Sequence, residues 1–115
     1  FLPVSAPFHC SLMKAAADKM DKKIKNTTFK NPQTTLVANV TAKEVNDSKE
    51  IKNLLVKQIV SRVRWRETVL YMIQNGVNEF IEIGPGKVLS GLVKRISDKV
   101  SSKSINTIED IKGLK

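Results

Sequence analysis

Histidine and cysteine are the scarcest of the reactive residues in this chain: it has one of each, and they are neighbours, His9 and Cys10. A single cysteine cannot form an internal disulfide, which is typical of a reducing, cytoplasmic compartment. A zinc site made of histidine and cysteine is excluded, because these two side chains are fewer than a closed site requires. A protease pair of the two is disfavoured, because such partners usually come from distant parts of a chain. We therefore expect no metal and no covalently bound cofactor.

Long apolar runs and aromatic side chains are also scarce. No apolar run is long enough to cross a bilayer, so no membrane partner is expected. Aromatic residues make up 5% of the chain and do not alternate with arginine, so no stacking platform for single-stranded nucleic acid is predicted. The 20 Lys and Arg give a net charge of +9, but they are scattered and accompany no zinc-finger or helix-turn-helix signature. A solvated lysine-rich surface is the simpler interpretation.

A small basic nucleic-acid-binding domain remains an alternative from another functional class. It predicts an affinity for DNA or RNA that falls steeply with salt.

The composition itself is that of a folded protein. The chain has 115 residues, of which 41% are apolar and 27% charged, and this size suits one modest core. It does not begin with methionine, and residues 1–4 are too few and too uncharged to form a signal peptide. This start predicts that the sequence is a piece of a longer polypeptide.

Apolar periodicity predicts alternating helices and strands. Five helices are predicted. The first begins at Leu12 and bears Met13, Ala16, Ala17, Met20 and Ile24 on one face, the second is capped by Asp47 and Glu50, and the third covers 65–75 and is ended by Gly76. The fourth follows Gly86 and has Lys94, Arg95 and Lys99 in its last turns, and the fifth is capped by Thr107 and Asp110. The predicted strands are residues 2–4, 35–41, 79–83 and a short one at Ile105, with loops over 44–48 and 101–104. An ion pair is expected between Asp18 and Lys22. This alternation favours an α/β layered fold with parallel strands.

The segment Gly84-Pro85-Gly86-Lys87 joins a predicted strand to a predicted helix, as phosphate-binding loops do. A Walker loop would need a glycine at Ile81 and a serine or threonine at Val88. A dinucleotide fingerprint would need a glycine at Leu89. Because these positions do not match, we interpret the segment as a tight structural turn.

His9 is the candidate catalytic residue, although an ordinary capping role is also open. Pro7 biases Ala6 towards extended backbone, and a helical pattern begins soon after His9, so the imidazole is expected where a strand-like segment becomes a helix. A histidine base would need a nucleophile. None of the nine serines lies in a Gly-x-Ser-x-Gly elbow, so a serine activated by His9 would lie outside these 115 residues.

Three segments together resemble the malonyl-CoA:acyl-carrier-protein transacylase family of bacterial fatty-acid synthesis. They are Pro-Val-Ser-Ala-Pro-Phe-His-Cys-Ser-Leu-Met at 3–13, residues 54–65, and Glu-Ile-Gly-Pro-Gly-Lys-Val-Leu at 82–89. The resemblance covers nearly the whole chain, but only the C-terminal portion of that enzyme. It implies that residues 1–115 are the C-terminal segment of the large subdomain, an α/β-hydrolase-like core, with residues 1–4 as the last strand of the small ferredoxin-like subdomain.

The resemblance also implies a reaction. In that family, a serine in a Gly-His-Ser-x-Gly elbow takes a malonyl group from malonyl-CoA and passes it to the phosphopantetheine thiol of acyl carrier protein. The matching histidine is His9, the general base. Gln58 matches the position whose backbone carbonyl orients that imidazole, and Phe8 matches a residue that lines the acyl pocket.

Other parts of the family pattern are absent from this chain. The nucleophilic serine and the arginine that binds the malonyl carboxylate lie upstream in the family, and none of Arg62, Arg64, Arg66 or Arg95 matches that arginine. We therefore expect the 115-residue chain to be inactive alone. The resemblance implies a complete, monomeric enzyme whose partners are a coenzyme A thioester and acidic acyl carrier protein, not nucleic acid. The nearest rival is the equivalent piece of a polyketide-type acyltransferase domain.

Overall fold

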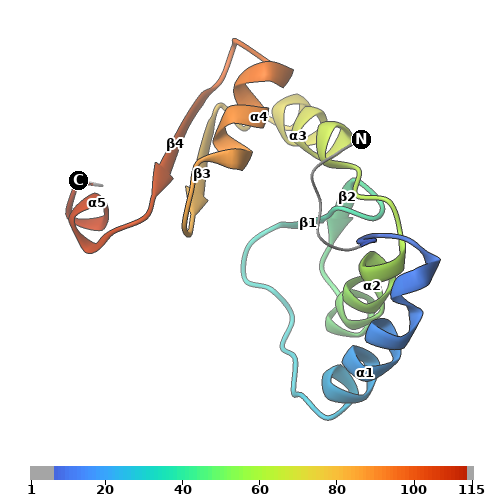
Figure 1. Cartoon of the computed structure of the whole chain (residues 1–115). Coiled ribbons are helices and arrows are strands. Elements are labelled where there is room, and N and C mark those ends of the chain that lie inside the picture. Colours follow the sequence, from blue (N-terminus) through green and yellow to red (C-terminus); the bar gives the residue numbers. More distant parts are fainter. Residues whose placement is uncertain (1–6, 114–115) are drawn as a thin grey trace. The chain divides into compact units, whose positions relative to one another are not determined.

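The computed structural model describes residues 7–113 and divides the chain into two compact units, Phe1–Thr68 and Val69–Lys115. The sequence predicted a single core, whereas the boundary between the units falls inside one helix. The strand predicted at residues 2–4 lies outside the described residues. None of the described helices is both long enough and apolar enough to cross a membrane. Figure 1 labels the elements.

The first unit contains two helices that pack against each other, α1 (Lys14–Lys25) and α2 (Ser48–Val60), with a short 3-10 helix, η1 (Ser11–Met13), before α1. Figure 1 shows them as neighbouring coils. The helix predicted from Leu12 begins as η1 and continues as α1. Ala17 and Ile24 of its predicted apolar face are buried, whereas Met20 on that face is 46% exposed. The predicted Asp18–Lys22 ion pair is wrong, because Asp18 pairs with Lys14 one turn earlier. Lys14 and Lys22 each lie one helical turn from Asp18, and the two possible exposed ion pairs differ little in free energy.

A β-hairpin completes the core of the first unit. Strand β1 (Leu36–Ala38) pairs antiparallel with β2 (Lys43–Val45), and Ala38 and Val45 are buried beside Ile51 of α2. The strand predicted over 35–41 is therefore too long, and the predicted loop over 44–48 is partly a strand. The chain reverses at Ala42, which has a positive φ of 54° and donates its N–H to Ala38 O at 2.8 Å.

The start of α2 and the end of α3 follow the predicted signals. The Asp47 carboxylate accepts a hydrogen bond from Glu50 N at 2.8 Å at the start of α2. Helix α3 (Trp65–Gln74) ends at Gly76, whose φ is 90°. Gly76 N donates to Ile73 O and Val77 N donates to Met72 O, each at 3.0 Å. These two bonds form a Schellman motif, which confirms the predicted C-terminal glycine.

The second unit is a β-α-β unit followed by a short helix. Strand β3 (Glu79–Ile83) pairs in parallel with β4 (Ser101–Ile105), and α4 (Val88–Ile96) connects them and contacts both. This confirms the α/β class with parallel strands. The predicted loop over 101–104 is wrong, since these residues belong to β4, and Lys99 follows α4 rather than lying in its last turn. Helix α5 (Ile108–Lys112) has the predicted capping box of Thr107 and Asp110.

The turn between β3 and α4 is structural, as the sequence predicted. Gly84 and Gly86 have φ values of 133° and 99°, which favour glycine. The Glu82 carboxylate accepts hydrogen bonds from Leu89 N at 3.1 Å and Ser90 N at 2.8 Å. The protein's own carboxylate therefore occupies the start of α4, where a phosphate would bind in a nucleotide-binding loop.

Candidate active site

His9 lies in a tight turn that leads into η1. Its backbone has a positive φ of 58°, a conformation that is unfavourable for most residues other than glycine. The Cys10 thiol donates to Pro7 O at 3.1 Å across the turn, and Met13 N donates to Cys10 O at 3.0 Å. The His9 side chain remains exposed in this turn.

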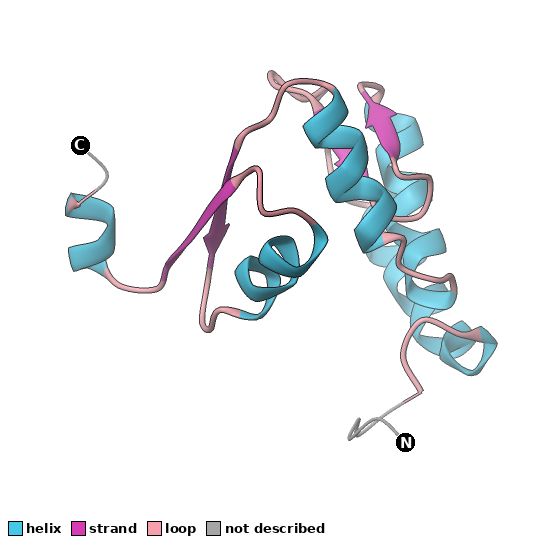
Figure 2. Ribbon diagram, turned by 90° about the horizontal axis from the view of Figure 1, so that it is seen from above, coloured by secondary structure: helices cyan, strands magenta, loops and turns pink. Residues whose placement is uncertain are grey.

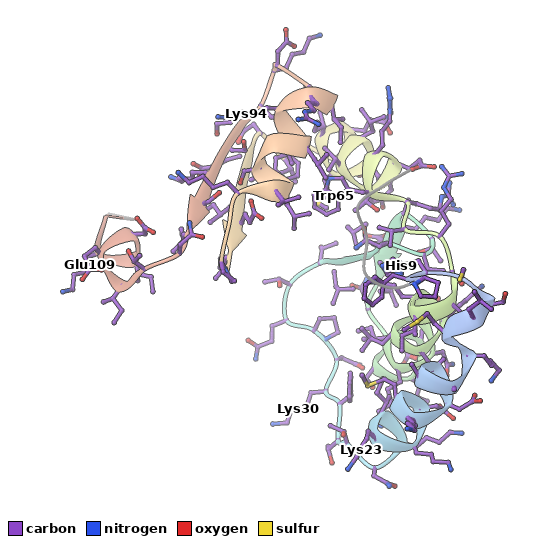
Figure 3. All side chains as sticks on the ribbon, in the orientation of Figure 1. His9, Lys23, Lys30, Trp65, Lys94 and Glu109 are labelled. Carbon is purple, nitrogen blue, oxygen red and sulfur yellow. The ribbon has the colours of Figure 1, made fainter. Side chains whose placement is uncertain are left out.

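The imidazole is anchored by the end of α2. His9 Nδ1 lies 2.9 Å from the main-chain oxygen of Gln58, in the last turn of that helix. Gln58 O also accepts a hydrogen bond from Ser61 N at 3.4 Å, and because a carbonyl oxygen has two lone pairs it can accept from both donors. Figure 3 shows His9 beside α2. The geometry brings together two residues that are far apart in the sequence and that the sequence analysis selected.

This contact determines which nitrogen of His9 carries the proton. A carbonyl oxygen only accepts hydrogen bonds, so the His9 Nδ1 must be the donor to Gln58 O. In a neutral imidazole the other nitrogen, Nε2, then keeps its lone pair and can take a proton. The arrangement is therefore chemically suited to a general base.

Phe8 adjoins His9 on the same turn and is 58% exposed. Gln58 is also one of the residues that line a hollow of about 200 Å³. The other residues of the hollow are mostly apolar, Leu36, Val37, Ala38, Asn39, Val45, Ile51, Leu54 and Leu55. Gln58 thus contacts His9 through its backbone oxygen and also lines the hollow.

The described residues offer no metal centre, because they contain no group of three or more His, Cys, Asp or Glu side chains placed to hold an ion. Glu82 is a polar anchor that the sequence analysis did not identify. Its pKa is lowered first by the hydrogen bond from Ser90 N, and further by Leu89 N and Ser104, while burial acts in the opposite direction. The position of Glu82 in the sequence, two residues before the glycine turn that leads into a predicted helix, was the signal that could have identified it as an anchor for the start of that helix.

No protein-family model matches the chain. Curated relatives do match. The chain is 44% identical over 105 residues to the malonyl CoA-acyl carrier protein transacylase of Escherichia coli (strain K12), covering 91% of this chain and 34% of that protein. It is 44% identical over 112 residues to the protein of that name from Staphylococcus aureus (strain MSSA476), covering 97% of this chain and 36% of that protein.

Solved structures agree with these relatives. An acyl carrier protein S-malonyltransferase from Vibrio cholerae superposes with a TM-score of 0.89 at 42% identity, over 99% of this chain and 37% of that one. A malonyl-transacylase in complex with its type II PKS acyl-carrier protein gives a TM-score of 0.86 at 42% identity, over 98% of this chain and 37% of that one. The chain spans about a third of the length of the relatives it matches. By sequence and by structure, this chain is homologous to the C-terminal third of malonyl CoA-acyl carrier protein transacylases.

Proposed function

We propose that this chain is the C-terminal segment of the large subdomain of a malonyltransferase, and that His9 is the general base of that enzyme. The observation that carries the proposal is the 2.9 Å contact between His9 Nδ1 and Gln58 O, which leaves Nε2 exposed and able to accept a proton. Homology to malonyl CoA-acyl carrier protein transacylases supplies the reaction in which such a base is needed.

The proposed reaction has two symmetric halves. His9 Nε2 takes the proton of a serine hydroxyl that lies outside this chain, and the serine oxygen attacks the thioester carbonyl of malonyl-CoA. The thiolate of coenzyme A leaves and takes the proton back from His9, which yields a malonyl-serine ester. The thiol of acyl carrier protein then repeats these steps in reverse. During each half the imidazolium is stabilised by Gln58 O.

Phe8 is proposed to line the acyl side of this site. It precedes His9 in the same exposed turn, so a substrate that reaches Nε2 passes close to it. Phe8 sets the shape available to the acyl group rather than taking part in proton transfer. The equivalent piece of a polyketide-type acyltransferase would have a different acyl preference, which competition between malonyl-CoA and methylmalonyl-CoA would reveal.

Acyl carrier protein is the proposed protein partner, and the distribution of charge supports it. The first unit, which contains His9, has 13 Lys and Arg against 6 Asp and Glu. The second unit has 7 against 5. The excess positive charge is thus concentrated in the unit that carries the base, where it would attract an acidic carrier protein.

The experiment is a chimera in which this chain replaces the matching third of the S. aureus relative. We expect malonyl transfer from malonyl-CoA to carrier protein, and we expect His9→Ala to lower its rate by about a hundredfold or more. Cys10→Ser, which keeps a hydrogen-bond donor beside His9, is the matched control and should retain activity. A folded chimera that transfers no malonyl, or one that tolerates His9→Ala, would contradict the proposal.

The 115-residue chain alone should have no activity, because it has no serine in an elbow motif. Turnover by this chain in the same assay would show that its nucleophile lies within it.

A further inference from the structure

The last turn of α2, which carries the acceptor for His9, has little to hold it within the helix itself. Among the residues of α2, Ile51 alone is buried, and it lies in the first turns. The helix ends at Ser61 in extended backbone, with φ of −117°, and not in the left-handed conformation that closes many helices. Contacts outside α2 must therefore keep its last turn in position.

Arg64 supplies such contacts just beyond the end of α2. Its backbone N donates to Asn39 O at 2.9 Å, and its Nη1 donates to Thr41 O at 3.2 Å. Its Nε lies 3.5 Å from Glu67 Oε1 in α3. One guanidinium can serve a carbonyl and a carboxylate together, because it has five N–H donors in a fixed plane. Arg64 thus joins the turn of the β1–β2 hairpin to the start of α3; Figure 2 draws the strands in magenta and the helices in cyan.

The β1–β2 hairpin consequently holds α2 at both ends. At the start of the helix, Ile51 is buried in the same core cluster as residues of both strands. At the other end, residues 61–63 separate the last turn from Arg64, and three residues of chain extend no further than about 11 Å. Moving Arg64 off the hairpin would therefore release the last turn of α2 and, with it, the carbonyl of Gln58.

We propose that Arg64 is a positioning residue: by tying the chain after α2 to the β1–β2 turn, it keeps Gln58 O where it accepts the Nδ1 proton of His9. Arg64 acts through the tautomer of His9, because the bond to Gln58 O is what places the proton on Nδ1. With the proton on Nε2 instead, that nitrogen has no lone pair to act as a base. The catalytic consequence rests on the proposed function, whereas the effect on the tautomer does not.

Arg62 provides a matched comparison. Its Nη2 lies 3.4 Å from the same Glu67 oxygen, and of the two arginines Arg64 alone also donates to the hairpin. A hydrogen bond from its own backbone lowers the pKa of Glu67 first, and Arg62 and Arg64 lower it further, while burial acts in the opposite direction. An effect that depends on positive charge or on Glu67 should therefore appear at both arginines, and an effect of the hairpin contact at Arg64 alone.

The test is an NMR measurement of the His9 tautomer in the 115-residue chain. His9 is the only histidine, so the imidazole nitrogens of a ¹⁵N-labelled sample give one set of signals. At about pH 9, where an imidazole is neutral, the chemical shifts of Nδ1 and Nε2 report which of them carries the proton. We expect Nδ1–H to predominate in the unchanged chain. Arg64→Ala should lower the ratio of Nδ1–H to Nε2–H by about threefold or more, as the loss of one hydrogen bond would, and Arg62→Ala should leave the ratio nearly unchanged.

Circular dichroism and urea unfolding establish that each variant is folded before its tautomer is compared. If Arg64→Ala does not fold, Arg64→Lys against Arg62→Lys makes the same comparison. A single ammonium nitrogen cannot serve Thr41 O and Glu67 with the geometry of a guanidinium, so Arg64→Lys should lower the ratio by about twofold or more. In the chimera, Arg64→Ala should lower kcat for malonyl transfer by about threefold or more and leave KM for malonyl-CoA nearly unchanged.

Three results would overturn the proposal. The first is an unchanged chain in which Nε2–H predominates, and the second is a folded Arg64→Ala chain with an unaltered tautomer ratio. The third is an equal fall in Arg64→Ala and Arg62→Ala, which would assign the effect to charge or to Glu67. A fall in the Nδ1–H population with no loss of malonyl transfer in the chimera would confirm Arg64 as a positioning residue and count against His9 as the base.

Discussion

His9 Nδ1 is held at 2.9 Å by the main-chain oxygen of Gln58, and no side-chain carboxylate is needed for this contact. The anchor is thus part of the α2 backbone. It keeps its position as long as the helix keeps its last turn, whatever side chain residue 58 carries.

Gln58→Ala should therefore leave malonyl transfer in the chimera within about twofold of its starting rate, because the substitution keeps the carbonyl and favours the helix. The measurement is kcat/KM for malonyl-CoA, with His9→Ala assayed in parallel as the inactive reference. A loss in Gln58→Ala comparable to that in His9→Ala would mean that the amide side chain, rather than the backbone, supports the base.

Glu82 should make the stability of the chain depend on pH. Hydrogen bonds from Ser90 N, Leu89 N and Ser104 lower its pKa in the folded state. The stabilisation is thus present above the unfolded pKa of about 4.3 and is lost as the pH falls through the lower folded value. Urea unfolding should show Glu82→Gln to be destabilised near neutral pH, with a deficit that shrinks towards about pH 3. A deficit that does not change with pH would contradict this.

Gly76 should be intolerant of a side chain for reasons of backbone geometry alone. A Cβ added there meets nothing within 4 Å, but the φ of 90° is unfavourable for other residues. Gly76→Ala should cost about 1–2 kcal/mol of unfolding free energy. Gly91→Ala is the matched control, because it is equally uncrowded but lies inside α4, where alanine should stabilise by about 0.5–1 kcal/mol. If both substitutions have the same sign, the backbone argument fails.

The lysines of α1 should steer the carrier protein. Lys14 and Lys25 are paired with aspartates, so Lys22 is the better probe. In the chimera, Lys22→Glu should lower kcat/KM for acyl carrier protein at low ionic strength, and added salt should reduce the difference. Lys112→Glu, the same charge change on α5, should have a smaller effect. Unchanged carrier kinetics in Lys22→Glu at low salt would remove α1 from the docking surface.

Local signals in the sequence predicted the helix ends that are set by capping or terminating residues. Asp47 and Thr107 cap their helices, and Gly76 ends α3, because each acts through neighbours a few residues away. The pairing of His9 with Gln58 came instead from the resemblance to a family, since no local pattern connects residues that are 49 positions apart. The catalytic role of that pair remains a prediction.

Two strands could not be predicted from local pattern. β2 places only Val45 inward, and one buried residue is too weak a signal. β4 is rich in serine, which usually indicates a loop. Its strand is stabilised by pairing with β3 and by hydroxyl hydrogen bonds to α4, and both depend on tertiary contacts that periodicity does not contain.

Because His9 has a left-handed backbone conformation, the residue that would be most stable at position 9 differs from the residue that supplies the imidazole. Glycine would occupy that conformation without the penalty of about 1 kcal/mol or more that a β-carbon brings, yet it would remove the only imidazole of the chain. A selection for heat resistance alone should therefore drift towards glycine or asparagine at residue 9. A selection for malonyl transfer should hold histidine there at a permanent thermodynamic disadvantage.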